Sequence, residues 1–299
     1  MNLPPPIPGS DRDRSTARGG PTIGAARSAT PIDTDAVRRA LHSDGVTGLQ
    51  GAFSREWTEQ LRTDIWKAFV AARRREGAAV GRGPQRFYVE VHPEQLRGTV
   101  DIMTHPWFTA VCATMLGPDY QIVEIGFDVP LPGAVDQPWH RDFAAPVETY
   151  RDHRLTSLAF NLTAVDTTAE MGPFEIAPGT QWEEGATFDH RMFPAKGEWP
   201  RFQALAVRKL PQMGDISVRS ALTIHRGTAN HSARPRPVLV VGVDAPGAGH
   251  AELHDMAVTR SYHDSLPEQL RSHLACAVVD ELHPIIAKHT IEGLVMGVS

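Results

Sequence analysis

The spacing of apolar residues predicts a long amphipathic helix in the first quarter of the chain. Four large apolar residues recur at helical intervals and share one face: Trp57, Leu61, Ile65 and Phe69. Ser54 is placed to cap the amino end of this helix, and the basic run 73–75 suits its carboxyl end. We therefore expect one helix face to pack against a sheet.

Two shorter helices and a strand flank this segment. Asp33 can cap a helix that runs through His42, and the stretch 45–50 then reads as a brief strand. A second short helix opens at His105 with a proline at its first position, and Gly117 ends it after Leu116.

Most of the remaining pattern is typical of β-strands. Alternating or continuous apolar runs predict strands at 86–92, 121–129, 155–165, 216–224 and 238–243, with a weaker candidate at 202–207. Glycine–proline pairs separate or bound these runs, and helices do not alternate with them, which favours a barrel or sandwich over a parallel sheet. A leucine-rich stripe between Ser265 and Leu282 predicts a final helix.

The two ends of the pattern set the domain boundaries. Residues 1–32 are rich in proline, glycine, serine and arginine and hold few large apolar groups, so we predict a disordered tail. No internal repeat or linker is visible afterwards, so residues 33–299 are expected to form one domain.

Candidate chemistry is concentrated at His140 and Asp142, two residues apart in a stretch that reads as a strand. Residues i and i+2 of a strand project from the same face, so both side chains would enter one cavity. An imidazole and a carboxylate supply two ligands of a 2-His-1-carboxylate site, which leaves half of the coordination sphere of Fe(II) open. His225, at the end of the run 216–224, is the candidate third ligand.

The order of these motifs resembles the phytanoyl-CoA dioxygenase-like family of Fe(II)/2-oxoglutarate-dependent oxygenases. The resemblance rests on Trp139-His140-Arg141-Asp142, on the block 171–180 (Met-Gly-Pro-Phe-Glu-Ile-Ala-Pro-Gly-Thr) and on the segment from His225 to Arg236. It covers residues 33–295 in order and spacing. It implies a mainly β double-stranded β-helix, a cupin-like jelly roll with flanking helices. It also implies Fe(II), 2-oxoglutarate and O₂ as cofactor and co-substrates.

The resemblance assigns further residues to the co-substrate. Arg236 matches the family's 2-oxoglutarate arginine in spacing, because a guanidinium can hold a carboxylate with paired hydrogen bonds, and Arg234 is the alternative. The family often carries a hydroxyl residue two positions after the distal histidine, where this chain has Gly227; Thr228 could substitute. Gln137 is a further candidate for co-substrate contact. No catalytic side chain beyond the metal ligands is expected.

The reaction expected by resemblance is the hydroxylation of a small or mid-sized metabolite, with release of succinate and CO₂; desaturation or ring closure are variants. Two other classes stay open: a metal-dependent cupin isomerase, which needs a fourth protein ligand, and a non-catalytic jelly roll that binds a small molecule. Arg86, Tyr88 and His92 share a strand face and could line the substrate pocket, although an exposed polar face is the simpler interpretation.

Composition limits the classes of binding partner that we expect. The net charge of −5 and the pI near 6.3 favour neither nucleic acid nor an anionic membrane, and no apolar run is long enough to span a bilayer. Cys112 and Cys276 form no disulfide framework, which suits a cytoplasmic protein. His231, His250 and His254 are interpreted as loop residues rather than ligands. The sequence sets no oligomeric state.

Overall fold

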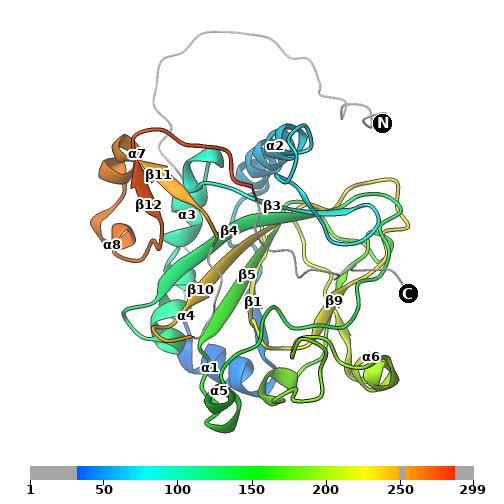
Figure 1. Cartoon of the computed structure of the whole chain (residues 1–299). Coiled ribbons are helices and arrows are strands. Elements are labelled where there is room, and N and C mark those ends of the chain that lie inside the picture. The colour runs from blue at the N-terminus through cyan, green and yellow to red at the C-terminus, as the bar shows by residue number, and fades with distance from the viewer. Residues whose placement is uncertain (1–31, 249–253, 287–299) are drawn as a thin grey trace.

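The described residues form a seven-stranded and a three-stranded antiparallel sheet, a two-stranded parallel sheet and flanking helices, seen in a computed structural model that describes residues 32–248 and 254–286 (Figure 1). The strands are β1 Val46–Leu49, β2 Val80–Gly81, β3 Arg86–Glu90, β4 Gln121–Pro130, β5 Ser157–Thr163, β6 Phe174–Ile176, β7 Val207–Arg208, β8 Ile216–Ser220, β9 His225–Gly227, β10 Val238–Asp244, β11 Ala257–Thr259 and β12 Ala277–Val279.

The helices flank the sheets. The α-helices are α1 Thr34–Ser43, α2 Arg55–Ala72, α3 Thr99–Met103, α4 Pro106–Leu116, α5 Val147–Arg151, α6 Trp199–Leu205, α7 Arg260–Ser265 and α8 Glu268–Arg271, and the 3-10 helices are η1 Pro93–Gln95, η2 Thr180–Trp182 and η3 Lys196–Glu198. Among the described residues, no helix is long and apolar enough to cross a lipid bilayer.

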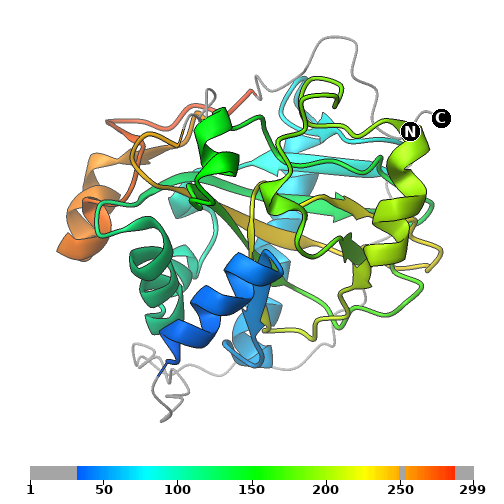
Figure 2. The same cartoon turned by 90° about the horizontal axis from the view of Figure 1, so that it is seen from below.

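The large sheet has the strand order β1-β8-β5-β10-β4-β3-β2, and the small sheet has the order β7-β6-β9. All pairs within these two sheets are antiparallel. Strand β10 occupies the centre of the large sheet, paired with β4 on one side and β5 on the other. Helices α1 to α4 gather on one side of the sheet, whereas β9 and α6 lie on the other (Figures 1 and 2).

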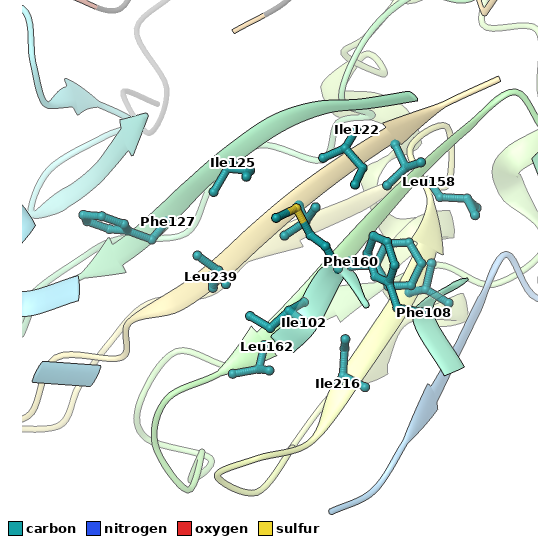
Figure 3. Packing of buried hydrophobic residues seen from close by; sticks show 14 of the residues in the cluster. Ile102, Phe108, Ile122, Ile125, Phe127, Leu158, Phe160, Leu162, Ile216 and Leu239 are labelled. Carbon is teal, nitrogen blue, oxygen red and sulfur yellow. The ribbon is translucent and has the colours of Figure 1, made fainter. Parts of the chain in front are cut away.

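Alternation along the central strands divides the molecule into a core and a cavity. One set of side chains enters the hydrophobic core against the helices, including Ile125 and Phe127 of β4, Phe160 of β5 and Leu239 of β10 (Figure 3). The intervening residues line a cavity between the sheets, among them Glu124 and Asp128 of β4, Asn161 of β5 and Val240 of β10. Because successive strand residues point to opposite faces, the register that buries the core also places the cavity's polar groups.

The helices predicted in the amino-terminal half are present. Ser54 accepts a hydrogen bond from the Trp57 backbone N–H and so caps α2, as expected. Asp33 caps α1 in the same way through Ala36, and α4 runs from Pro106 to Leu116 with Gly117 after it. Strand β1 lies within the predicted stretch 45–50.

Two local predictions were wrong. The weak strand at 202–207 is mostly helix α6, which begins with proline at its first turn and buries Phe202 against Trp139 and Phe188. The predicted carboxyl-terminal helix at 265–282 is instead α7, α8 and strand β12. Pro267 separates the two short helices because the residue before a proline avoids the helical region, and 277–279 pairs in parallel with β11.

Two further predictions lie wholly or largely outside the described residues. The proposed disordered tail, residues 1–32, lies there apart from Ile32, as does His250. The assignment of residues 33–299 to one domain stays a prediction. Cys112 and Cys276 are free thiols, as the sequence suggested.

Candidate metal centre and active site

His140, Asp142 and His225 converge in the wall of the cavity. One ligand atom from each residue lies within 4.8 Å of the others, and Nε2 of His225 is 3.3 Å from Oδ1 of Asp142. His140 and His225 face each other in an isolated antiparallel bridge, in which each backbone N–H donates to the other's carbonyl at 3.0 and 2.8 Å. The three residues therefore form a compact set of two imidazoles and a carboxylate, the donor set of a non-haem Fe(II) site.

The local backbone differs from the expected one. Asp142 lies in a bend rather than in a strand with His140, and its backbone N–H donates to the Ala221 carbonyl at 3.0 Å. Strand β8 ends at Ser220, so His225 begins β9 instead of closing one continuous run. A short-range pattern of alternation could not reveal these breaks, because they depend on hydrogen bonds between segments about 80 residues apart in sequence.

Both imidazoles are held in the tautomer that suits metal binding. Nδ1 of His140 is 2.8 Å from the Pro138 carbonyl oxygen, and Nδ1 of His225 is 2.9 Å from the Thr223 carbonyl oxygen. A carbonyl oxygen only accepts, so each Nδ1 carries the proton and each Nε2 keeps its lone pair. Burial lowers the pKa of both histidines. The pKa of His140 is lowered further because a second proton on the neighbouring His225 ring would repel its own, and the charge of Arg219 lowers the pKa of His225 further. Both rings are therefore neutral ligands at physiological pH.

Arg219 of β8 is a site residue that the sequence interpretation did not single out. Its guanidinium binds both oxygens of Asp142, with Nη2 to Oδ1 at 3.1 Å and a shorter bond from Nη1 to Oδ2. Burial opposes ionisation of Asp142, but the charge of the Arg219 guanidinium holds its pKa well below the usual range. Arg219 thus keeps the carboxylate ionised and oriented. Its sequence signal was a lone charge in a run that is otherwise apolar or small.

Arg236 enters the same cavity and Arg234 does not. The Arg236 side chain is 5% exposed and lines the cavity, while Arg234 is exposed. Among the described residues, no carboxylate lies within ion-pair distance of the Arg236 guanidinium, and its buried Nε has no hydrogen-bond partner. Burial and the nearby Arg86 lower the pKa of Arg236 to about 10, so the group stays charged. A buried cation without a counter-ion is costly, and an anionic ligand would satisfy it.

The other two residues assigned to the co-substrate differ in position. Gln137 lines the cavity, and its Oε1 accepts a hydrogen bond from the Gly227 backbone N–H at 3.0 Å. The Thr228 hydroxyl donates to the Pro173 carbonyl at 2.7 Å, and Thr228 is not part of the cavity wall. The geometry therefore favours Gln137 over Thr228 as a residue within reach of a bound molecule.

The strand face of β3 is buried rather than exposed. Arg86 and Tyr88 are 1% and 3% exposed and both line the cavity, so the simpler interpretation of an exposed polar face was wrong for them. His92 is also buried, but it lies outside the cavity wall, beside the His283 carbonyl and the Ala257 backbone N–H. His231 is exposed in the turn after β9, as expected.

Comparison with known proteins decides the family. The family model described as phytanoyl-CoA dioxygenase (PhyH) matches residues 41–238, which is more than half of the chain and includes all three candidate ligands. The chain belongs to the phytanoyl-CoA dioxygenase (PhyH) family.

Solved structures with the same fold confirm the jelly roll predicted for this PhyH member. EctD from S. alaskensis with 2-oxoglutarate and 5-hydroxyectoine has a TM-score of 0.58 at 16% identity, covering 74% of this chain and 79% of EctD. The non-haem α-ketoglutarate-dependent carbocyclase SnoK from nogalamycin biosynthesis has a TM-score of 0.56 at 19% identity, covering 79% and 89%. The epimerase SnoN from the same biosynthesis, in complex with Fe³⁺, α-ketoglutarate and nogalamycin RO, has a TM-score of 0.55 at 18% identity, covering 71% and 83%.

Gly227 departs from the PhyH pattern for a steric reason. A Cβ atom at this position would lie 2.5 Å from Nη1 of Arg86 and 2.7 Å from Oε1 of Gln137. The space that a hydroxyl side chain would occupy is thus filled by Arg86, whose guanidinium bonds Asp128 at 3.0 Å and the Thr228 carbonyl at 2.9 Å. In this chain, a buried charge on Arg86, beside Arg236, takes the place of that hydroxyl group.

Replacing Gly227 by alanine should therefore destabilise the protein and distort the cavity. To admit a methyl group, the Arg86 guanidinium and the Gln137 amide would have to shift away from their hydrogen bonds with Asp128, the Thr228 carbonyl and the Gly227 backbone N–H, and overpacking a close-packed interior costs about 1–3 kcal/mol. Urea unfolding measures the loss. Gly81→Ala is the control, because a Cβ atom at Gly81 would meet nothing within 4 Å. An unchanged free energy of unfolding for Gly227→Ala would contradict the close approach.

Proposed function

We propose that this PhyH-family protein is a non-haem Fe(II)/2-oxoglutarate-dependent dioxygenase that hydroxylates a small metabolite. The observation that carries the proposal is the buried Arg236 guanidinium, which has no counter-ion among the described residues and shares a cavity with His140, Asp142 and His225. A cavity that combines three candidate metal ligands with a buried cation suits a dicarboxylate that binds both.

The residues present fit iron and 2-oxoglutarate. The two Nε2 atoms and the Asp142 carboxylate are the ligands that hold Fe(II), and three ligands leave coordination positions for small molecules. Arg236 binds the far carboxylate of 2-oxoglutarate with paired, charge-assisted hydrogen bonds. When bound, iron and 2-oxoglutarate supply the oxidising chemistry, in which O₂ is consumed as 2-oxoglutarate is decarboxylated to succinate.

Lys209 and Arg219 extend the cationic wall of the co-substrate site. The Lys209 ammonium donates to the Ser217 hydroxyl at 2.7 Å and lies 5.2 Å from the centre of the Phe174 ring. Ser217 and Arg219 are two apart on β8 and share its cavity face, so Lys209 is close to the metal side of the cavity. We include Lys209 in the co-substrate site, where a second cation strengthens the binding of a dianion.

The reaction type rests on the intact carboxylate and on the range of related folds. Asp142 occupies an anionic ligand position, which favours hydroxylation over reactions that need that position open. The structural relatives include an epimerase and a carbocyclase, so the shared fold serves several oxidative outcomes. An isomerase of the metal-cupin type is disfavoured, because the candidate metal cluster in the described residues holds three ligands rather than four.

The test is co-substrate turnover by the purified protein. We expect succinate to form from 2-oxoglutarate only when Fe(II) and O₂ are both present, and Zn(II) in place of iron should abolish it. Binding of 2-oxoglutarate to the iron-loaded protein without O₂ should produce a visible absorption band, which reports binding apart from turnover. Absence of both the band and succinate in a protein that holds stoichiometric iron would exclude the proposed function.

The affinity for 2-oxoglutarate should fall as the pH rises above about 7, because burial, Arg219 and Arg236 lower the pKa of Lys209 to about 7. A bound dianion favours the charged amine and raises that pKa. Below about pH 7 the amine is already protonated, whereas above it binding must take up a proton, so affinity falls by up to about tenfold per pH unit.

Absorption titrations without O₂ between pH 6 and 9 measure this dependence. Lys209→Arg should bind well and flatten the profile, since its guanidinium does not titrate in this range, and Lys209→Met should bind weakly at every pH. An unchanged slope in Lys209→Arg would assign the dependence to another group.

A further inference from the structure

The charges that line the cavity do not all belong to the metal and co-substrate sites. The wall contains five cationic side chains and three carboxylates: Arg82, Arg86, Lys209, Arg219 and Arg236, with Glu124, Asp128 and Asp142. Two ion pairs account for four of them, Arg86 with Asp128 at 3.0 Å and Arg219 with Asp142. With Lys209 and Arg236 assigned to 2-oxoglutarate, one cation and one carboxylate remain, Arg82 and Glu124.

Arg82 and Glu124 contact the same aromatic side chain, Arg82 over the face of its ring and Glu124 at its hydroxyl group. The Arg82 guanidinium lies 4.1 Å from the centre of the Tyr88 ring, and the Tyr88 hydroxyl donates to Oε1 of Glu124. Tyr88 is 3% exposed, and burial raises its pKa well above the usual value, so the phenol stays a neutral donor. The two charges therefore both adjoin Tyr88, one at the ring face and one at the hydroxyl group.

Two glycines make room for this arrangement. A Cβ atom at Gly126 of β4 would lie 2.4 Å from the Tyr88 hydroxyl oxygen, and one at Gly242 of β10 would lie 2.7 Å from Oε2 of Glu124. Any larger residue at position 126 or 242 would displace the phenol or the carboxylate. The Tyr88–Glu124 pair is thus built into the packing of the central strands.

Each charged group keeps binding capacity that faces the cavity. Among the described residues, Oε2 of Glu124 accepts no hydrogen bond, and the Glu124 side chain is 21% exposed. His254 lies 3.7 Å from the other oxygen, Oε1. No carboxylate of the described residues lies within ion-pair distance of the Arg82 guanidinium, which lies over the Tyr88 ring. Val238 and Val240 add an apolar part to the same cavity.

We propose that the substrate is a small amino-acid-like zwitterion, whose protonated amine binds Glu124 and whose carboxylate binds Arg82. This assignment rests on the proposed function, because it takes the cavity that also holds the candidate metal ligands as the substrate site. A molecule with one charge of each sign neutralises both groups at once, whereas a singly charged molecule leaves the other charge of this partly buried pair without a counter-ion. The apolar valines contact the carbon skeleton between the charges.

The experiment compares matched ligands on the iron-loaded protein without O₂. The probes are the twenty protein amino acids and a set of β- and γ-amino acids, each tested beside its N-acetyl derivative and its primary amide. Shifts in the absorption band of the iron–2-oxoglutarate complex and isothermal titration calorimetry both report binding without turnover. We expect at least one free amino acid to bind, and loss of either charge to weaken it about ten- to a hundredfold.

Two substitutions test which residue binds the amine of the ligand and which binds its carboxylate. Glu124→Gln should remove the preference for the free amine over the N-acetyl derivative, and Arg82→Gln should remove the preference for the acid over the amide. Arg74→Gln, on an exposed arginine outside the cavity, is the control and should change neither preference. The comparison of matched ligands on the unaltered protein needs no variant, so it stands even where a substitution impairs folding.

The outcomes separate this proposal from the proposed function. A protein that binds 2-oxoglutarate but none of the amino acids overturns the zwitterion assignment and leaves the dioxygenase function standing. Binding that is equal for the free and blocked ligands, or variants that alter neither preference, overturns it as well. A protein that binds iron but not 2-oxoglutarate overturns the proposed function itself.

Discussion

Replacing His225 by alanine should yield a folded protein that no longer retains iron and forms no succinate. The imidazole supplies one of three ligands, and a two-ligand site loses most of its affinity for Fe(II). The fold should persist, because the backbone bridge between His140 and His225 does not involve the side chain. Iron per chain after loading without O₂ and gel filtration gives the first quantity, and circular dichroism on heating gives the second.

The matched control for this variant is His231→Ala. His231 lies in the turn after β9 and is exposed, so the same substitution six residues away should leave iron binding unchanged. His140→Ala should reproduce the loss seen for His225→Ala. Stoichiometric iron in either ligand variant would show that the metal is held elsewhere.

Replacing Arg236 by alanine should weaken 2-oxoglutarate binding while iron binding stays the same. A charge-assisted interaction contributes about 1.5–3 kcal/mol, which corresponds to roughly ten- to a hundredfold in affinity. Arg236→Lys should have a smaller effect, since it keeps the charge but loses the paired donors. The absorption band of the iron–2-oxoglutarate complex, followed without O₂, measures the dissociation constant, and metal analysis measures the iron.

The stability of the Arg236 variants gives an independent check. In the ligand-free protein this guanidinium is buried beside Arg86 without a carboxylate partner among the described residues, so an apolar replacement removes a desolvated charge. Arg236→Met should therefore have a thermal midpoint equal to or above that of the unaltered protein, even though it binds 2-oxoglutarate poorly. Arg234→Ala, on the exposed arginine, should change neither property. A loss of 2-oxoglutarate affinity in Arg234→Ala alone would reverse the choice between the two arginines.

These variants also separate the possible classes of function. Loss of iron in His225→Ala with normal 2-oxoglutarate binding in Arg236→Ala would favour a metal cupin of another kind. Loss of iron in His225→Ala together with loss of 2-oxoglutarate binding in Arg236→Ala supports the dioxygenase function. The two measurements use different residues of one cavity, so one result does not follow from the other.

The sequence could predict the features that depend on residues close together in the chain or on the residue type alone. The helical spacing of Trp57, Leu61, Ile65 and Phe69 predicted α2, because residues at this spacing form one apolar face when the segment is helical. The apolar runs that form β4, β5, β8 and β10 were likewise predictable from the residues of each run alone. His140, Asp142 and His225 stood out because few residue types bind metal, and their order along the chain matched the PhyH pattern.

Only the tertiary structure decided which charges matter. Arg219 is one of many arginines in the sequence until β8 places it against Asp142, and Arg236 is distinguished from Arg234 only by burial. Arg82 follows β2, Tyr88 lies in β3 and Glu124 lies in β4, and the pairing of β2 with β3 and of β3 with β4 brings them together. The same holds for Asp142, which lies in a bend tied to Ala221 rather than in a strand. The energy of a charged side chain depends on its solvent exposure and its partners, and residues far apart in sequence set both.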